Sequence, residues 1–155
     1  MDKEIESMAV IEEILMEQEI GRLGTCHGSR PYVVPLNYGY RDGKIFFHSF
    51  KEGKKMRNLT LNPEVCFEVD IGQIIESEKP CDFSYRYRSV IAYGHAKVIK
   101  DEWEKLRALT IIVEKYSPGK GRRLDMSTIR SYPNLVVVEI DIKEMTGKSS
   151  PSTTG

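Results

Sequence analysis

The sequence lacks a surplus of charge of either sign and any long apolar run. Lys and Arg together number 23, as do Asp and Glu, so the formal net charge is zero. Proteins that bind nucleic acid in bulk need a basic surplus, which this balance does not provide. No apolar run approaches the ~20 residues that cross a bilayer. The acidic start MDKEIESM also lacks the basic-then-apolar order of a signal peptide. We therefore expect no nucleic-acid partner and no membrane attachment.

Cysteine and histidine are scarce and scattered. Cys26, Cys66 and Cys81 form an odd set without C-x-x-C spacing, which favours reduced thiols in a cytoplasm. The three histidines are dispersed along the chain, so no metal site is expected. G-x-S-x-G, H-E-x-x-H and Walker motifs are all missing from the sequence. These absences remove the commonest hydrolase, metalloprotease and nucleotide-binding classes.

The composition is sufficient for one globular domain. The chain has 155 residues, and 40% of them are hydrophobic, which is enough for one core of ordinary size. We see no linker and no repeat, and predict a single domain over residues 1–148. The remaining SSPSTTG has few groups that could pack, so residues 149–155 are predicted to form a flexible tail.

Periodicity predicts a mainly β protein with flanking helices. Six strands are predicted: Ile20–Cys26, Pro31–Tyr40, Lys44–Phe50, Glu64–Asp70, Tyr85–Lys100 and Asn134–Lys148. Helices are predicted over Met8–Glu19, Glu52–Leu61, Asp101–Tyr116 and Met126–Ser131, and a long connection over 71–84. Short strands joined by tight turns favour a closed antiparallel barrel, because closure removes exposed edges.

The stretch FFHSFKEGKK places unusual chemistry where a strand meets a helix. Gly53, Lys54 and Lys55 fall at the predicted helix start, where free backbone N–H groups attract anions. Asn58 follows one turn later. The pattern is consistent with a phosphate pocket, and equally with a solvated basic helix face. His48, in the preceding strand, is either a ligand or a half-buried strand histidine.

Two further stretches carry polar or strand-breaking residues. In VVPLNY, Pro35 removes one ladder hydrogen bond, so nearby backbone groups could turn toward a ligand such as the ring edge of a flavin. Asn37 is either a hydrogen-bonding side chain or a polar residue near a turn. We expect this stretch to lie antiparallel to Lys44–Phe50 across the Asp-Gly turn. Alternatively, Pro35 only marks an edge strand or a bulge. In YRYRSV, Arg86 and Arg88 face one way and suit phosphate, or pair with surface acids.

Taken together, these stretches resemble a known family. The segment EIGRLGTCHGSRPYVVPLNYGYRDGKIFFHSFKEGKKMRNLTLNPEVCFEVD, followed by YRSVIAYGHA, is similar to the pyridoxamine 5′-phosphate oxidase-like FMN-binding split-barrel superfamily. The similarity is closest to its Nim-type, 5-nitroimidazole-resistance branch. It covers about residues 20–96, and more loosely the last strand through TGK. The resemblance implies a six-stranded antiparallel split barrel and a homodimer with FMN between the subunits.

The resemblance also implies roles for individual residues. Lys54 and Lys55 would hold the phosphate, and His48 would be the candidate catalytic residue. The remaining implied cofactor contacts lie along the ring (Val34, Pro35, Leu36, Asn37), beside the ribityl chain or phosphate (His48, Ser49, Asn58) and on a second strand (Arg88, Ser89, Val90). Lys148 would close the site. The chain lacks the C-terminal aromatic and arginine residues of the true oxidases, so pyridoxamine phosphate oxidation is not expected.

Three functions remain open at this point. The first is an FMN-dependent reductase that takes electrons from NADH or NADPH and reduces a small acceptor such as a nitroaromatic compound, with the flavin supplying the redox chemistry. The second is a non-catalytic flavin-binding protein. The third is a haem-binding member of the same fold, with His48 or His95 as the iron ligand.

Overall fold

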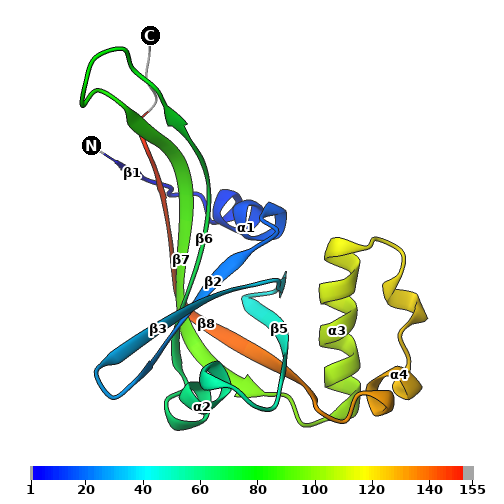
Figure 1. The fold of residues 1–155 in the computed structure, drawn as a ribbon. Helices are drawn as coiled ribbons and strands as arrows, with labels where there is room; N and C mark the ends of the chain where they lie inside the picture. The colour runs from blue at the N-terminus through cyan, green and yellow to red at the C-terminus, as the bar shows by residue number, and fades with distance from the viewer. Residues whose placement is uncertain (1, 152–155) are drawn as a thin grey trace.

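The computed structural model describes residues 2–151, which form one antiparallel sheet with helices on its flanks (Figure 1). The strands are β1 (Lys3–Glu4), β2 (Gly21–His27), β3 (Arg30–Leu36), β4 (Gly39–Arg41), β5 (Lys44–Phe50), β6 (Glu64–Ile75), β7 (Ser84–Val98) and β8 (Leu135–Ser149). The helices are α1 (Met8–Glu17), α2 (Lys54–Leu61), α3 (Glu102–Tyr116), the 3-10 turn η1 (Gly121–Arg123) and α4 (Met126–Ser131).

The sheet order is β3-β2-β6-β7-β8-β5-β4, and β1 pairs with β8. The predicted class, mainly β with flanking helices, is confirmed. The predicted count of six strands is wrong, because the described chain contains eight. Closure is wrong as well: within residues 2–151 no pairing joins β3 to β4, so the sheet is open. Both end strands therefore keep one backbone edge outside the ladder.

The predicted strand Pro31–Tyr40 breaks at Tyr38. The Tyr38 ring is fully buried, and its hydroxyl donates to Leu15 O at 2.6 Å. Its backbone N–H donates to the Tyr116 hydroxyl at 2.8 Å instead of to a neighbouring strand. As a result β3 pairs with β2, and only β4 pairs with β5 across the Asp42–Gly43 turn. The expected pairing of the VVPLNY stretch with Lys44–Phe50 is therefore incorrect.

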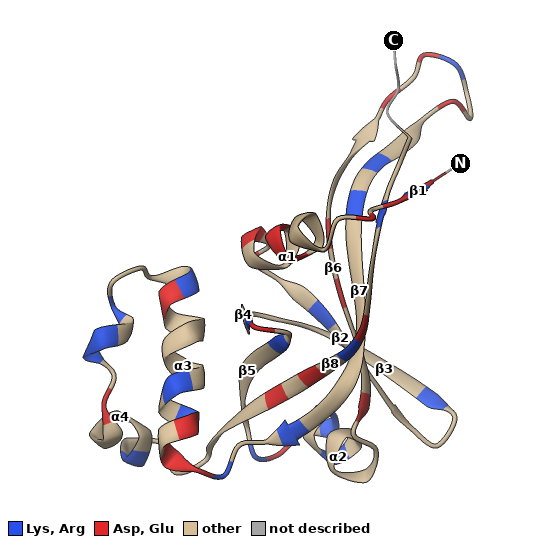
Figure 2. Ribbon diagram, turned by 180° about the vertical axis from the view of Figure 1, so that it is seen from behind, with Lys and Arg blue, Asp and Glu red and all other residues tan. Residues whose placement is uncertain are grey.

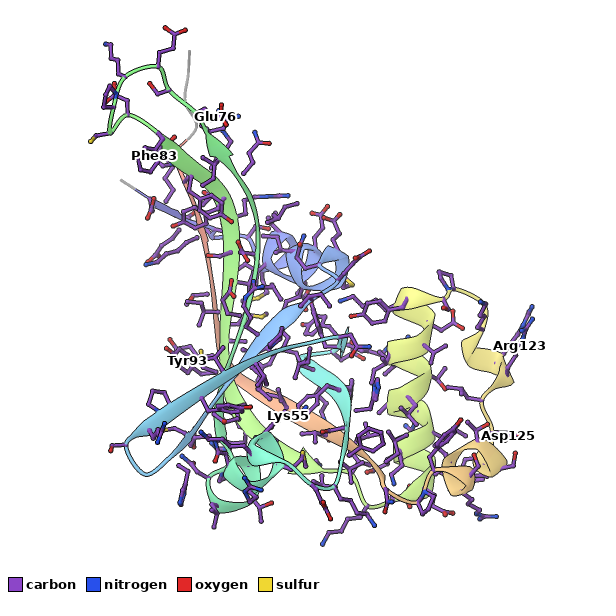
Figure 3. The ribbon with its side chains drawn as sticks, viewed as in Figure 1. Lys55, Glu76, Phe83, Tyr93, Arg123 and Asp125 are labelled. Atoms are coloured by element: carbon purple, nitrogen blue, oxygen red, sulfur yellow. The ribbon has the colours of Figure 1, made fainter. Side chains whose placement is uncertain are left out.

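The β6–β7 hairpin is longer than the sequence suggested. Residues expected to be a connection extend both strands, and the ladder runs out to the pair Ile75–Ser84. β8 accompanies β7 only as far as the pair Arg88–Ser149, so the outer hairpin is a two-stranded ribbon. Figure 3 shows Glu76 and Phe83 at its far tip. Since isolated ribbons of this kind are marginally stable, this arm is suited to pack against another surface.

The predicted tail is partly structured. Ser149 belongs to β8, and the Ser150 backbone N–H donates to Tyr87 O at 2.9 Å. Ser149 and Ser150, which were predicted to belong to the tail, are therefore part of the described fold. Residues 152–155 lie outside the described part of the chain.

Strand β5 is covered on both faces, which explains its consecutive buried residues. Ile45 and Phe47 belong to the main core, which also holds Leu15 of α1. Phe46 belongs to a second core beneath α3. Side chains alternate along a strand, so His48, two residues after Phe46, also faces α3.

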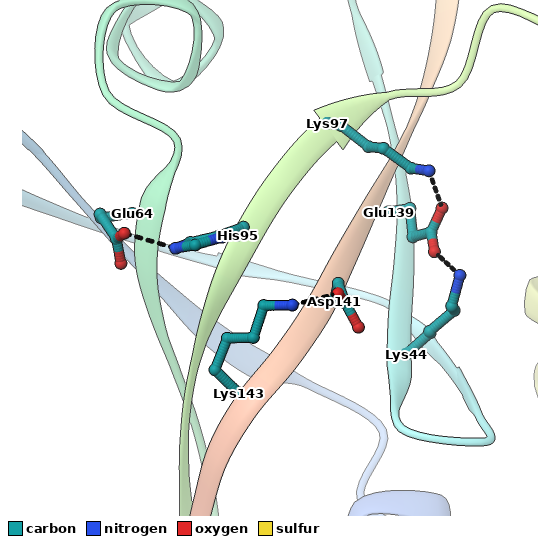
Figure 4. A network of polar contacts seen from close by, with 7 residues as sticks. All are labelled: Lys44, Glu64, His95, Lys97, Glu139, Asp141 and Lys143. Atoms are coloured by element: carbon teal, nitrogen blue, oxygen red, sulfur yellow. Dashed lines mark hydrogen bonds and ion pairs between the residues drawn. The ribbon is translucent and has the colours of Figure 1, made fainter.

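A buried carboxylate ties three strands together (Figure 4). Glu139 of β8 is 4% exposed and forms ion pairs with Lys44 of β5 and Lys97 of β7. Burial would raise the pKa of Glu139, but the hydrogen bonds and charges of the two ammonium groups outweigh burial and lower it. Glu139 is therefore ionised at neutral pH and fixes the register of β8 between its neighbours.

Lys115 provides a pH test of the packing around Tyr38. Its ammonium lies 3.4 Å from the centre of the Tyr38 ring and donates to Leu15 O at 3.3 Å. Burial lowers the pKa of Lys115 to about 8. An unfolded lysine titrates near pH ~10.4, so between about pH 8 and pH 10 the unfolded chain binds more protons. The contribution of Lys115 to stability should therefore rise with pH across this window.

The measurement is the free energy of unfolding of wild type minus that of Lys115→Met, by urea denaturation at several pH values. The subtraction removes the contributions of tyrosines and cysteines that titrate in the same range. We expect the difference to increase between about pH 8 and pH 10. A difference that stays flat or falls across this window would show that Lys115 is not desolvated.

Candidate functional site

The start of α2 has the features of an anion site. Gly53 is the N-cap residue, and no side chain caps the first-turn N–H groups. Its φ of 119° is a conformation that residues with a Cβ rarely adopt. Lys54 and Lys55 are the first two helical residues, so the helix start carries two cationic side chains. An uncapped helix start with two cations is favourable for a phosphate group.

We call the start of α2, with Gly53, Lys54 and Lys55, the α2 corner. Each of its two lysines also contacts an aromatic ring. The Lys54 ammonium lies 4.6 Å from the centre of the Tyr32 ring, which links α2 to β3. The Lys55 ammonium lies 5.3 Å from the centre of the Phe47 ring, which links α2 to β5. The corner therefore joins β3, β5 and α2 through two cation–π contacts. Tyr32 is a site residue that the sequence did not indicate, because its contact with Lys54 spans 22 positions.

His48, Ser49 and Lys55 open onto a pocket of about 520 Å³ between β5, α3 and α4. Burial, and then the charge of Lys55, lower the pKa of His48. His48 is therefore neutral at pH 7. Burial also lowers the pKa of Lys55, and an anion beside its ammonium would oppose this effect, because an opposite charge favours the charged form. Figure 3 shows Lys55 where α2 faces β5, far from the hairpin tip.

The β3 residues flank this corner from the other side. Val34 and Leu36 are half-buried and pack on the main core, while Pro35 is exposed. Asn37 is half-buried at the break between β3 and β4. β3 ends the sheet order, so its second backbone edge has no partner strand within residues 2–151. The backbone groups on this edge of β3 are therefore available for the predicted contacts with the flavin ring.

Asn58 and Val90 occupy positions different from those expected. Asn58 is 5% exposed, and its amide donates to Thr25 Oγ1 at 3.0 Å, so it anchors α2 to β2. We therefore assign Asn58 a positioning role for the lysines. Val90 is fully buried in the main core, so its side chain does not face a groove. Of the three predicted contacts on β7, Arg88 is exposed, Ser89 is half-buried and Val90 is buried.

One chain does not bring Arg88 to the α2 corner. Both β5 and β7 pair with β8: His48 is opposite Val137, and Arg88 is opposite Ser149. These positions are twelve residues apart on β8, which corresponds to about 40 Å along the strand. Figure 1 shows α2 and the outer part of β7 at opposite ends of the sheet. A single FMN cannot contact both groups within one chain.

The anchoring role of Asn58 gives a stability prediction. In Asn58→Ala, the cavity and the lost hydrogen bond should destabilise the fold by roughly 1–3 kcal/mol, measured by urea denaturation. Arg57→Ala, an exposed neighbour on the same helix, is the matched control and should change stability by less than about 0.5 kcal/mol. Equal effects of the two substitutions would contradict the assignment.

The opposite wall of the pocket was missed by sequence reasoning. It comes from α3 and from the segment that leads into β8. The helices themselves were predicted, but their apolar residues were expected to pack in the core and not to line a pocket. No local pattern distinguishes a stripe that lines a pocket from one that packs on a sheet.

Two negative findings apply to the described part of the chain. Between residues 2 and 151, no set of three or more His, Cys, Asp or Glu side chains is arranged to hold a metal ion. Over the same residues, no helix has the length and apolar character to cross a membrane. Figure 2 shows acidic and basic residues interspersed over the strands and helices, with basic residues on α2.

The open antiparallel sheet with helices on its flanks is consistent with the split-barrel fold. A family model described as pyridoxamine 5′-phosphate oxidase matches residues 7–149, so the chain belongs to this family. A search of curated proteins gives no match.

Solved structures agree with this assignment. A protein from Bacteroides thetaiotaomicron, assigned to 5-nitroimidazole antibiotic resistance, is 29% identical with a TM-score of 0.82, over 96% of this chain and 87% of that one. The flavocytochrome Anf3 from Azotobacter vinelandii is 21% identical with a TM-score of 0.82, over 96% and 70%. An FAD and haem binding protein from Mycobacterium smegmatis is 18% identical with a TM-score of 0.84, over 97% and 74%. The last two show similarity of fold.

Proposed function

We propose that this protein binds FMN at the start of α2 and acts as an FMN-dependent reductase of small acceptors. The observation that carries the proposal is the uncapped Gly53 helix start, with Lys54 and Lys55, beside a pocket of about 520 Å³. The residues fit the cofactor: the phosphate meets two cations and free N–H groups, and the ring meets apolar side chains and the open edge of β3.

The family context supports a flavin. Related structures of the same fold are named for a flavocytochrome and for FAD and haem binding. The α2 corner favours FMN in particular, because a terminal phosphate can end at a helix start with two lysines. His95 is a weak candidate for haem, since it is paired with Glu64 on the outer sheet face.

The proposed site is completed by a second copy of the chain. Arg88 and Ser89 lie about 40 Å along β8 from the strand position opposite His48. Their contribution to one FMN therefore needs the partner of a homodimer. The outer hairpin supports this assembly, because it carries apolar side chains that are exposed in one chain. A second chain packed on the hairpin would bury them. Those side chains are Ile71, Ile74, Phe83 and Tyr85.

FMN, when bound, supplies the electron transfer between a nicotinamide donor and the acceptor. The residues of the protein hold and orient the cofactor. Lys54 and Lys55 fix the phosphate and thereby the position of the ring. His48, neutral at pH 7, presents a nitrogen to the ring or to the acceptor for hydrogen bonding or proton exchange.

The test begins with the ligand of the purified protein. A yellow protein that releases material with the mass and spectrum of FMN on denaturation is the expected result. A Soret band would favour the haem-binding alternative. Anaerobic addition of NADH or NADPH should then bleach the flavin, and a small nitroaromatic should restore its colour. A yellow protein that no donor bleaches would overturn the reductase and leave a flavin-binding protein.

A further inference from the structure

A pocket of about 300 Å³ lies between α3 and the β4–β5 hairpin, and we call it the α3 side pocket. On one flank of the helix, Arg107 and Ile111 are one turn apart and line it. On the other flank, Leu109 and Val113 line the pocket beside His48. No residue lines both pockets, and none of the proposed cofactor contacts lines the α3 side pocket. Its chemistry is therefore separate from that of the flavin site.

The cationic residues of the α3 side pocket fall into two pairs. Lys44 and Lys97 form ion pairs with the buried carboxylate of Glu139 (Figure 4). Arg41 of β4 and Arg107 of α3 are exposed, and within the part of the chain that the structure describes their side chains have no hydrogen bond or ion pair. An anion that enters the pocket therefore meets these two guanidinium groups.

The two arginines border a common space. Arg41 and Arg107 also line a neighbouring pocket of about 340 Å³, so they stand where two pockets meet. They reach this place from opposite walls, one from β4 and one from α3. The third cation of the neighbouring pocket, Lys115, is already engaged, because it donates to Leu15 O at 3.3 Å. Guanidinium groups bind the two oxygens of a carboxylate in a fork, which suits this placement.

The floor and the total charge of the pocket define the class of ligand. Phe46, Ile99 and Ala108 are buried and form an apolar floor. Over the whole lining, four cationic side chains accompany three carboxylates, which leaves one positive charge. A ligand with one negative charge would neutralise this lining. A ligand with an apolar body would also remove the floor from water, which is favourable.

The acidic residues at the rim do not fill the site. Asp42 and Glu104 are exposed, and neither forms an ion pair with Arg41 or Arg107. An ion pair between exposed side chains would contribute little, because water screens the charges and both side chains lose freedom. A ligand that pairs with the arginines and also covers the apolar floor has a contribution that these carboxylates lack.

We propose that the α3 side pocket binds a small monocarboxylate with an apolar body about the size of one ring, and that its carboxylate lies between Arg41 and Arg107. This site is additional to the proposed reductase site and does not depend on FMN. Pockets of this size with apolar walls and a few polar groups are typical of small-molecule sites. The bound carboxylate would join β4 to α3, so the ligand should also stabilise the fold.

The test is calorimetric titration of the purified full chain, with whatever flavin it carries, at about pH 8. The probe is 3-phenylpropionate, and its dissociation constant should be about 1 mM or lower. 3-Phenylpropionamide lacks the charge and acetate lacks the apolar body, so each should bind at least about tenfold more weakly. Phenyl phosphate carries two charges at this pH and should also bind more weakly. Equal binding of the amide, or tighter binding of phenyl phosphate, would overturn the assigned class of ligand.

Two substitutions locate the binding site. Arg41→Gln and Arg107→Gln should each weaken 3-phenylpropionate by about 5- to 30-fold, because each removes one charge-assisted contact. Both side chains are exposed, so both variants should fold. Arg123→Gln changes an exposed arginine of η1 that lines neither pocket, and should leave the constant unchanged. The probe should raise the melting temperature of wild type and of this control by more than that of the other two variants.

The outcomes separate this site from the flavin site. A wild type that does not bind the probe, or an affinity that both Arg41→Gln and Arg107→Gln retain, would overturn the proposed site. FMN content, measured in parallel, should be the same in wild type and all three variants. Wild type without FMN that still binds the probe through the two arginines would count against the proposed function and support this second site.

Discussion

Replacing Lys54 and Lys55 together by alanine is expected to weaken FMN binding by roughly 2–4 kcal/mol, or about 30- to 1,000-fold. Both lysines belong to the first turn of a helix in which no side chain caps the first N–H groups. Each should contribute one charge-assisted contact to the phosphate. Binding is measured by quenching of FMN fluorescence at fixed ionic strength, because screening alters contacts of this kind.

Riboflavin separates the phosphate contact from the ring contact. It lacks the phosphate and should bind wild type and the double variant about equally. A second control is the double alanine variant of Lys79 and Lys120, since it makes the same change in net charge. Both lysines are exposed; Lys79 lies in the hairpin loop and Lys120 at the N-cap of η1. Retention of wild-type FMN affinity by the Lys54 and Lys55 variant would show that the phosphate lies elsewhere.

Subunit complementation should give the second large effect. A chain carrying Lys54→Ala and Lys55→Ala has a damaged α2 corner, and a chain carrying Arg88→Ala has a damaged β7 strand. Each homodimer should bind FMN poorly at both sites. In a mixed dimer, one site should receive the intact α2 corner from one chain and the intact Arg88 from the other. Mixing the two variants should therefore restore one wild-type site per mixed dimer.

The measurement is FMN stoichiometry after the two variants are refolded together, with differently tagged chains so that the mixed dimer can be isolated. We expect about one tightly bound FMN per mixed dimer and none in either parent. The reason is the placement of the two groups twelve residues apart on β8. A mixed dimer that binds no FMN tightly would show that each chain builds its own site. A monomer with full affinity would contradict the shared site directly.

The parts of the fold that the sequence predicts are those with local signals. The start of α3 follows from Asp101, whose side chain accepts from Glu104 N at 2.9 Å. The alternation over Glu64–Asp70 correctly gives a strand with one face in the core. The Asp42–Gly43 turn is where the sequence places it, and both residues have positive φ. Each of these signals acts over a few residues, so one sequence is sufficient to reveal it.

The features that the sequence does not reveal depend on distant partners. The break at Tyr38 exists because the Tyr116 hydroxyl, 78 positions later, takes over its backbone N–H. The pairing of β1 with the end of β8 joins the two ends of the described chain. Glu139 looks like a solvated residue in an alternating strand, yet Lys44 and Lys97 make its burial tolerable. None of these pairs has a spacing that a local pattern could indicate.

The candidate site also contains residues that local sequence indicates and residues that only distant partners place. His48, Ser49 and Lys55 are close in sequence and open onto one pocket. Asn58 was expected at the phosphate because helical spacing puts it near Lys54, but the direction of its side chain is set by Thr25 of β2. The apolar wall opposite His48 comes from residues more than 50 positions later. The composition of this wall could be read only from the folded chain.

The central claim is that two cations at the start of α2 hold the phosphate of a flavin whose binding site is shared between two chains. A crystal structure of the protein with FMN tests it most directly. The account predicts the phosphate within hydrogen-bond distance of Lys54 and Lys55 of one chain, with Arg88 of the second chain at the same cofactor. A flavin bound elsewhere while this corner stays empty, or one held entirely by a single chain, would contradict it.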